Sequence, residues 1–282
     1  MVRDEPGRQK NIQGVLDELN SLVGLKTVKK MIAEIHAFVD IQKYRQKEKL
    51  ISEPQVLHMV FKGNPGTGKT TVARILGKLF REAGVLPRGH LVEAERADLV
   101  GEYIGHTAQK TREQLRKATG GIMFIDEAYA LARGGDKDFG KEAIDTLVKH
   151  MEDFKDNFIL VLAGYEQEMD RFMETNPGLR SRFPIHITFP DYNTSELADI
   201  AVIMVKARDY FLSSGAQEEL RVILEGHRGM HKHSGNARLV RNLIERATRL
   251  QAVRLIGQDH LTRDDLMCIS REDIAGTRDQ IT

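Results

Sequence analysis

Short apolar runs alternate with longer amphipathic segments through the first two thirds of the chain. Five such runs predict buried strands, at residues 57–62, 90–94, 122–126, 158–163 and 185–189. Apolar residues at helical spacing predict helices at residues 27–44, 70–83, 107–118, 141–153 and 166–174. Because strands that alternate with helices form βαβ units, the pattern predicts an α/β fold with a mostly parallel sheet.

The pattern changes after Asp191, where helical spacing continues without a convincing strand. The helices predicted there cover residues 194–210, 216–226, 236–255 and 262–269. We therefore expect a large α/β domain over residues 16–191 and a small helical domain over residues 192–282. Residues 1–15 are rich in charge and Gly, and we expect them to form a flexible leader.

Composition and charge restrict the classes of function. The 282 residues include 42 Lys and Arg against 41 Asp and Glu, a balance that argues against a dedicated nucleic-acid or membrane-surface binder. No apolar run approaches the ~20 residues that span a bilayer, and the polar N-terminus shows no secretory signal. Cys268 is the only cysteine, which excludes an internal disulfide and fits a reducing compartment. We expect a cytoplasmic protein without a membrane partner.

The segment after the first predicted strand carries a phosphate-binding motif. Residues 63–70 read GNPGTGKT and match G-x-x-x-x-G-K-[ST] at every fixed position, between a predicted strand and a predicted helix. Glycines let backbone N–H groups converge on phosphate oxygens, and the helix start adds partial positive charge. Lys69 can reach the β- and γ-phosphates, and the Thr70 hydroxyl can ligate Mg²⁺. The predicted ATP-binding residues are Asn64, Pro65, Gly66, Thr67, Gly68, Lys69, Thr70 and Thr71.

Two consecutive acids follow the third predicted strand. Asp126 ends the run at residues 122–126 and Glu127 follows it, at the carboxyl end of a buried strand, where ligands bind in open α/β sheets. Asp126 would hold the Mg²⁺ shell, and Glu127 would orient or deprotonate the attacking water. Acids after a strand are by themselves usually a solvated turn. The phosphate loop upstream favours the catalytic interpretation.

The two motifs, which correspond to Walker A and Walker B, and the segments around them resemble the AAA+ ATPases over roughly residues 16–269. The segments that carry the resemblance are residues 61–71, 93–111 (EAERADLVGEYIGHTAQKT), 124–131 (FIDEAYAL) and 139–153 (FGKEAIDTLVKHMED). They are most similar to the branch that includes a bacterial sporulation ATPase and the red-type rubisco activases. The resemblance implies a five-stranded parallel sheet followed by a helical lid, with nucleotide between them. It also implies a ring, a hexamer in the first instance, that remodels a protein client.

The resemblance assigns roles to a loop and to two arginines. Tyr103 and Ile104 correspond to the aromatic–hydrophobic–Gly step that lines the central pore and grips polypeptide; the alternative is a tyrosine packed in a surface loop. Arg182, with Arg180 as second choice, resembles the arginine finger that stabilises charge on the γ-phosphoryl group of a neighbouring subunit. Outside this context, two such arginines would be solvated or ion-paired.

Further positions are implied at the lid and near the base. Arg238, in the string SGNAR at residues 234–238, matches the sensor 2 position that reaches toward the γ-phosphate, and Arg241 is a weaker candidate. Val23 and Gly24 resemble the segment that packs on adenine. A simple turn at a helix entry explains a lone glycine equally well.

The end of the fourth predicted strand departs from the family pattern. Many AAA+ proteins carry a polar sensor 1 residue there, whereas Ala163 and Gly164 cannot polarise water, and we assign no catalytic role to Tyr165. His231 and His233 are two residues apart and would diverge on a helix, so we expect no metal site there.

We therefore expect an ATPase that couples hydrolysis in a ring to remodelling of a protein client, in the context of bacterial sporulation. One alternative is a rubisco-activase-like remodeller that responds to a sugar phosphate. A second is a nucleic-acid motor or loader, against which Tyr103 and the near-neutral charge argue. A third, a scaffold that binds ATP only to assemble, conflicts with the intact Lys69, Asp126, Glu127 and Arg182.

Overall fold

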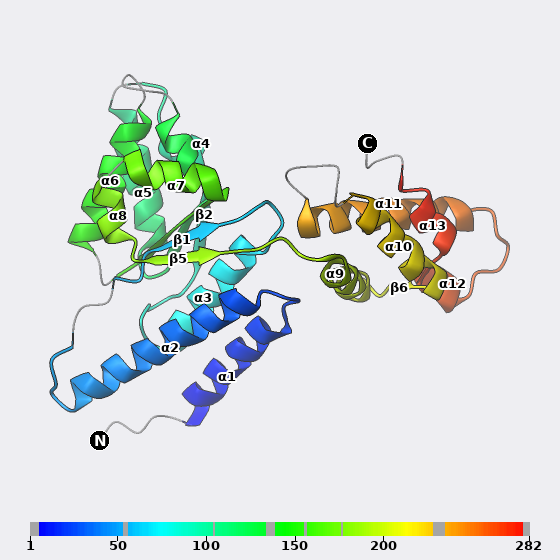
Figure 1. The fold of residues 1–282 in the computed structure, drawn as a ribbon, viewed down its shortest axis with the longest axis horizontal. Helices are drawn as coiled ribbons and strands as arrows, with labels where there is room; N and C mark the ends of the chain where they lie inside the picture. The colour runs from blue at the N-terminus through cyan, green and yellow to red at the C-terminus, as the bar shows by residue number, and fades with distance from the viewer. Residues whose placement is uncertain are drawn as a thin grey trace. The chain divides into compact units, whose positions relative to one another are not determined.

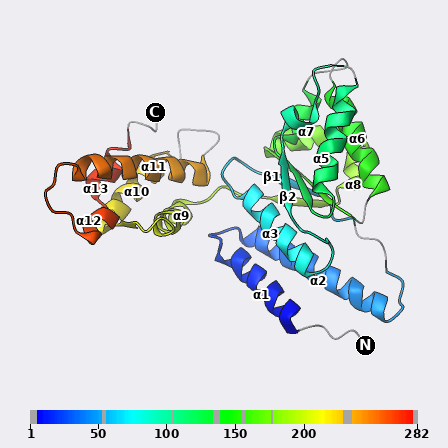
Figure 2. The same cartoon turned by 180° about the vertical axis from the view of Figure 1, so that it is seen from behind.

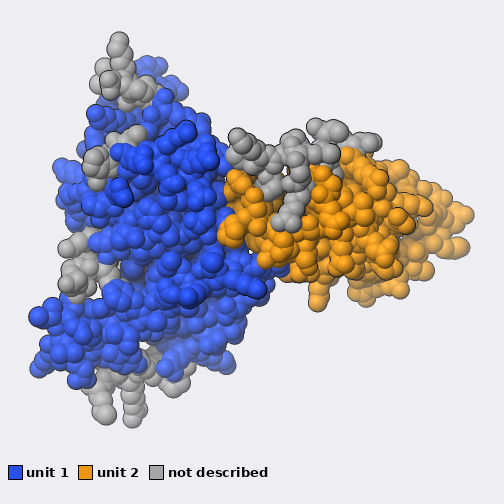
Figure 3. Space-filling model, viewed as in Figure 1, with its two compact units in different colours: residues 1–63, 69–189 blue, residues 64–68, 190–282 orange. Residues whose placement is uncertain are grey.

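The computed structural model describes residues 6–52, 56–103, 105–133, 139–154, 157–175, 177–227 and 235–278. The chain divides into two compact units, which Figure 3 shows in different colours. The first unit contains residues 1–63 and 69–189, and the second contains residues 64–68 and 190–282. The second unit thus joins the C-terminal part of the chain to five residues of the phosphate loop.

The first unit is built on a five-stranded parallel sheet, as predicted. Its strands are β1 (Met59–Lys62), β2 (Leu91–Ala94), β3 (Ile122–Ile125), β4 (Ile159–Gly164) and β5 (Ile185–Thr188). Their order across the sheet is β2-β3-β4-β1-β5, so β1 pairs with both β4 and β5. Every residue of β3 and β4 is buried, which explains why these strands appear in the sequence as continuous apolar runs.

Helices cover both faces of this sheet, as Figure 1 and Figure 2 show. One layer contains α1 (Pro6–Ser21), α2 (Lys26–Lys47) and α3 (Lys69–Glu82). The other contains α4 (Arg96–Leu99), α5 (His106–Ala118), the 3-10 turn η1 (Ala128–Ala132), α6 (Gly140–Asp153), α7 (Glu166–Thr175) and α8 (Pro177–Arg182). A core that includes the buried Phe158, Met169 and Phe183 lies under this second layer.

The N-terminal segment differs from the prediction. Residues 6–15, expected to be part of a flexible leader, form most of α1, while residues 1–5 lie outside the described part of the chain. Polar contacts join α1 to α3: Lys78 Nζ lies 2.8 Å from Glu18 Oε1, and Asn11 Nδ2 donates to Glu82 at 3.1 Å. Tertiary contact rather than a strong apolar stripe supports this helix, so the hydrophobic pattern does not reveal it.

The second unit is mainly helical. Its helices are α9 (Thr194–Lys206), α10 (Ser214–His227), α11 (Asn236–Leu255), α12 (Arg263–Met267) and α13 (Arg271–Ala275). It also contains two short parallel strands, β6 (Phe211–Leu212) and β7 (Cys268–Ile269), where the sequence predicts none. Two residues are too few to show strand periodicity. The helix predicted over residues 262–269 therefore ends at Met267.

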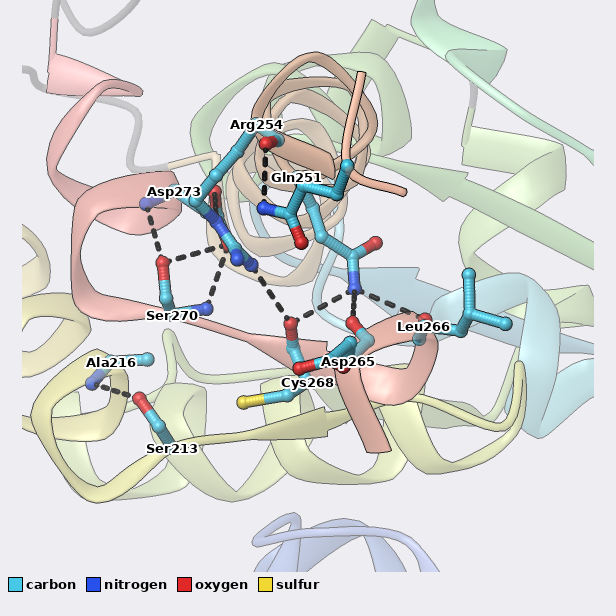
Figure 4. A network of polar contacts seen from close by, with 10 residues as sticks. Ser213, Ala216, Gln251, Arg254, Asp265, Leu266, Cys268, Ser270 and Asp273 are labelled. Carbon is cyan, nitrogen blue, oxygen red and sulfur yellow. Dashed lines mark hydrogen bonds and ion pairs between the residues drawn. The ribbon is translucent and has the colours of Figure 1, made fainter. Parts of the chain in front are cut away.

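Polar side chains of α11 fix the C-terminal segment of this unit (Figure 4). The Arg254 guanidinium makes two hydrogen bonds, of 3.0 and 2.9 Å, to the buried carboxylate of Asp273. The amide of Gln251 donates to three backbone carbonyls, those of Asp265, Leu266 and Cys268. Across the described ranges, no helix is both long enough and apolar enough to cross a membrane.

Candidate functional site

The phosphate loop begins at the carboxyl end of β1, in the interior of the sheet. The Gly63 N–H donates to the carbonyl of Gly164 at the end of β4, at 3.0 Å. A Cβ on Gly63 would lie 2.4 Å from the Phe189 carbonyl oxygen. No side chain fits at this position, so the first fixed glycine of the motif is required by close backbone packing.

The middle of the loop, residues 64–68, turns sharply at two glycines. Gly66 and Gly68 have φ of +75° and +96°, in the left-handed region that favours glycine. The Thr67 hydroxyl donates to the carbonyl of Asn64 at 2.8 Å and closes the turn. Within the second unit, a Cβ on Gly66 would lie 2.6 Å from the Gly235 carbonyl oxygen, so a side chain would collide with backbone.

The end of the loop enters α3, whose first residue is Lys69. The Lys69 side chain is buried, with 8% of its surface exposed, and its Nζ donates to the Gly63 carbonyl at 2.8 Å. Thr70 is half-buried and Thr71 is exposed. The ammonium group thus folds back over the loop from the start of a helix, where partial positive charge already favours anions.

The two acids follow the carboxyl end of β3, as the phosphate loop follows the carboxyl end of β1. Only β4 lies between these two strands in the sheet. Asp126 is half-buried, and its backbone N–H donates to the Ala94 carbonyl at 3.1 Å. Glu127 is exposed and has φ of +46°, and its backbone N–H donates to Asp126 Oδ1 at 3.0 Å. The adjacent carboxylates therefore have different surroundings: that of Asp126 is held by the next N–H, and Glu127 is exposed to solvent.

These groups fit Mg²⁺ held together with phosphate. Hydroxyl and carboxylate oxygens, such as those of Thr70 and Asp126, are the ligands that Mg²⁺ prefers. No group of three or more His, Cys, Asp or Glu side chains that could hold a metal ion occurs among the described residues. Mg²⁺ usually binds through one or two protein ligands, waters and substrate phosphates, so a sparse set of this kind matches its chemistry.

A tyrosine ring packs against the end of β4, where the sequence lacks a polar sensor residue. A Cβ on Gly164 would lie 2.7 Å from a ring carbon of Tyr129, so the ring fills the space of the missing side chain. The Tyr165 ring lies 6.2 Å from that of Tyr129, and the Arg133 guanidinium carbon lies 4.7 Å from the Tyr129 ring centroid. Burial raises the pKa of Tyr129 to about 12, so its hydroxyl keeps its proton even in moderately alkaline solution.

The predicted finger arginine is engaged within its own chain. Arg182 ends α8, where its Nη1 donates to the Gly178 carbonyl at 2.8 Å and its Nη2 pairs with the carboxylate of Glu152 on α6. Arg180 is exposed on the same helix. An arginine that acts on a neighbouring subunit would have to leave the ion pair with Glu152.

The predicted pore residue lies on an exposed turn. Tyr103 has 66% of its surface exposed, and its ring meets His106 edge-on at 5.5 Å between centroids. Gly105 has φ of +83° and immediately precedes α5. Ile104, the other predicted pore residue, lies outside the described residues. Strong exposure of a large aromatic ring is consistent with a contact role.

The remaining predicted residues lie at helix entries. Arg238 is exposed in the first turn of α11, in the second unit. Val23 and Gly24 are half-buried in the turn between α1 and α2, where Gly24 and Leu25 have φ of +62° and +55°. The two residues predicted to contact adenine therefore belong to a tight left-handed turn.

Three residues contact the phosphate loop although sequence reasoning does not select them. Asp191 and Tyr192 lie at the expected domain boundary, and Asn236 opens α11. Their side chains form hydrogen bonds with one another and with residues 64–67. The only local signal is the consecutive Gly235 and Asn236, two residue types that tolerate unusual backbone angles and so indicate a sharp turn.

Comparisons with known proteins show the family of the chain. Residues 59–191 match the family described as "ATPase family associated with various cellular activities (AAA)", and residues 193–282 match the "AAA lid domain". Stage V sporulation protein K of Bacillus subtilis is 56% identical over 261 residues, covering 92% of this chain and 81% of that protein. The chloroplastic ribulose bisphosphate carboxylase/oxygenase activase of Cyanidioschyzon merolae is 44% identical over 275 residues, covering 96% and 94%.

Solved structures show the same fold at low identity. The RuvB Holliday junction branch migration motor of Thermotoga maritima superposes with a TM-score of 0.59 at 20% identity, covering 93% of this chain and 71% of that one. The two domain matches and the relatives at 56% and 44% identity all indicate the same family. The chain belongs to the AAA+ ATPases, a family of ATP-hydrolysing enzymes.

Proposed function

We propose that the chain is the subunit of a ring-forming AAA+ ATPase, in the first instance a hexamer, that uses ATP hydrolysis to remodel a protein client. The observation that carries this proposal is the phosphate loop after β1 and the acid pair after β3 at one edge of the sheet. We take residues 16–191 as the ATPase domain, preceded by the first part of α1, and residues 192–282 as its lid.

In this proposal the loop and the acids divide the work. The N–H groups of residues 64 and 66–71 bind phosphate oxygens, while Pro65, which has no N–H, shapes the turn. Lys69 neutralises charge on the β- and γ-phosphates. Thr70 and Asp126 hold Mg²⁺, which would balance phosphate charge when bound. Glu127, exposed on its left-handed turn, accepts a proton from the attacking water or orients it.

Two arginines complete the charge stabilisation. Arg182 of one subunit contacts the γ-phosphoryl group in the next, with Arg180 as the second candidate, and Arg238 reaches the same group from the lid. Val23 and Gly24 contact the adenine. In this role Arg182 leaves its ion pair with Glu152, whose carboxylate is solvent-exposed, and exchanges it for a phosphate.

The proposed work product is movement of polypeptide, with Tyr103 and Ile104 as the gripping residues. An exposed aromatic ring can pack on any side chain without reading its sequence. The higher identity to the Bacillus sporulation protein favours a client in sporulation. The 44% identity to the algal activase supports the second candidate, a remodeller of rubisco that responds to a sugar phosphate. A nucleic-acid motor, as RuvB is titled, is the weakest of the three candidates, because the net charge of this chain is only +1.

Complementation between two inactive variants tests the shared site. Glu127→Gln removes the base but retains Arg182, and Arg182→Ala removes the finger but retains the base. Each variant alone should release phosphate at least about 100-fold more slowly, since an arginine finger contributes roughly 10³–10⁵ in rate. Mixed in equal amounts, they should recover a measurable rate, because some mixed interfaces contain both groups. No recovery from two well-folded, co-assembling variants would refute a finger supplied by a neighbour.

Crosslinking in cells with the Glu127→Gln variant tests the client class. A slow variant should hold ATP and any engaged polypeptide, and Tyr103→Ala in the same background should release the client without loss of ATP binding. Recovery of nucleic acid alone would exclude protein remodelling. Capture of rubisco, together with a sugar-phosphate effect on ATPase rate, would select the activase-like function.

A further inference from the structure

Three consecutive carbonyls of the phosphate loop are hydrogen-bonded by residues of the second unit, to which loop residues 64–68 also belong. The acceptors are the carbonyls of residues 65, 66 and 67. The donors are Asn236 Nδ2 at 3.4 Å, the Ala237 backbone N–H at 3.2 Å and the Tyr192 hydroxyl at 3.1 Å. The three acceptor carbonyls therefore face a single group of residues.

This arrangement fixes the direction of the opposite peptide groups. In a planar trans peptide, the carbonyl of one residue and the N–H of the next point in opposite directions. The N–H groups of Gly66, Thr67 and Gly68 consequently point away from the residues that hold the carbonyls. A phosphate cradle requires successive backbone N–H groups turned toward the anion and not toward protein acceptors.

Asn236 is the centre of this contact. It is buried, with 1% of its surface exposed, and its Oδ1 accepts from the Tyr192 N–H at 2.9 Å. Its Nδ2 donates to Asp191 Oδ1 at 2.8 Å, and the same carboxylate accepts from Asn64 Nδ2 at 3.0 and 2.9 Å. One side chain thus orders both residues of the 191–192 segment against the loop.

The backbone at Asn236 contributes as well. Its φ of +44° lies in the left-handed region, where Asn is tolerated better than most residues. The next N–H, of Ala237, belongs to the first turn of α11 and has no acceptor inside the helix. It donates instead to the loop carbonyl of Gly66. Burial raises the pKa of Tyr192 to about 12, which extends the pH range over which its hydroxyl is a donor.

We propose that Asp191, Tyr192, Asn236 and Ala237, here called the loop clamp, preset the phosphate loop for the β-phosphate of a nucleoside di- or triphosphate, with Asn236 as its central positioning residue. The inference rests on the proposed nucleotide site but not on ring assembly, on hydrolysis or on the client. A preset loop binds more tightly because no binding free energy is used to turn its peptide planes.

Two substitutions test the clamp without strain on the backbone. Tyr192→Phe removes one hydroxyl and keeps the ring in place. Asn236→Gly removes the side-chain amide but still permits a left-handed φ, so the Ala237 contact can persist. The matched control is Asn193→Ala, in the same segment, where the lost side chain caps α9 by accepting from the Glu196 N–H at 2.9 Å.

Fluorescent mant-ADP binding and steady-state ATPase kinetics on the full chain give the readout. Loss of one hydrogen bond should weaken mant-ADP binding and raise KM about two- to tenfold in Tyr192→Phe, and more in Asn236→Gly. The kcat at saturating ATP should stay within about twofold of wild type, as expected when uniform binding is lost. Asn193→Ala should lower the melting temperature but leave mant-ADP affinity unchanged.

Unchanged mant-ADP affinity and KM in folded Tyr192→Phe and Asn236→Gly would overturn the loop clamp. A fall in kcat at constant KM would also overturn it, because the residues would then act after binding. If Asn236→Gly fails to fold, Tyr192→Phe alone decides. Since mant-ADP binding needs no turnover, a wild-type chain that binds ADP but does not hydrolyse ATP would refute the proposed function and leave this test intact.

Discussion

His58 should make the stability of the first unit fall as the medium becomes mildly acidic. The residue immediately precedes β1, has 3% of its surface exposed, and lies 5.4 Å from the ring of Phe158 and 5.9 Å from that of Phe183. Its Nδ1 accepts a hydrogen bond from the Leu160 N–H at 3.0 Å. Protonation would place a second donor against that N–H and a charge in an apolar core. Burial accordingly lowers the pKa of His58 from 6.5 to about 4.

The magnitude follows from the linkage between folding and protonation. Below pH 6.5 the unfolded chain binds a proton that the folded chain refuses, so His58 stabilises the fold fully above pH 6.5 and progressively less toward pH 4. With these pKa values, the loss between pH 7 and pH 5 is about 2 kcal/mol, and the limit well below pH 4 is about 3 kcal/mol.

Urea unfolding followed by circular dichroism at pH 7 and pH 5 measures this loss. His58→Asn keeps an acceptor for the Leu160 N–H and removes the titrating group. It should be less stable than wild type at pH 7, because packing is lost. Its free energy of unfolding should fall by about 2 kcal/mol less than that of wild type between pH 7 and pH 5. The exposed His260→Asn is the control and should keep the wild-type profile. An identical pH dependence in wild type and His58→Asn would refute the reasoning.

Three further outcomes are expected. Glu152→Gln should raise the ATPase rate by no more than about fivefold, because an exposed ion pair with Arg182 contributes at most ~1 kcal/mol; a larger rise in phosphate release would mean that this pair controls the enzyme. Gly66→Ala should weaken mant-ADP binding about tenfold or more, since its Cβ would meet backbone at 2.6 Å and its φ is left-handed; wild-type affinity would contradict the cradle geometry. Asp273→Ala should destabilise the second unit by about 3 kcal/mol in urea unfolding, because it leaves Arg254 without its paired carboxylate; a loss below ~1 kcal/mol would show that the pair is replaceable.

The fold could be predicted where burial imposes a pattern. The strands of the central sheet are covered on both faces, so β1, β3 and β4 appear as apolar runs that begin or end within two residues of their predicted limits. Elements held by polar or long-range contacts could not be predicted. The helix α1 depends on its contacts with α3, and β6 and β7 contain two residues each.

The chemistry of the candidate site could be predicted where its residues are adjacent in sequence. The phosphate loop and the acid pair are local motifs, because a strand end must present several groups within a few residues. The loop clamp is different in kind. Tyr192 and Asn236 lie 125 and 171 positions after the loop residues that they contact. Taken alone, each is a common residue type at a domain boundary or at the start of a helix. Only the folded chain brings these groups together.

Backbone strain links the two kinds of residue. Non-glycine residues with positive φ are uncommon. Among the described residues they are Glu127 after β3, Asn236 at the start of α11, Leu25 beside the Val23–Gly24 turn, Lys49 after α2 and Asp209 after α9. The first three lie in or next to a segment proposed to contact ATP, whereas Lys49 and Asp209 do not. A left-handed residue costs roughly 1–2 kcal/mol unless its surroundings enforce it, so such positions persist where the fold fixes them. At Glu127 and Asn236 the result is the same: the strained residue directs a polar group, a carboxylate or an N–H, that a relaxed backbone would direct elsewhere.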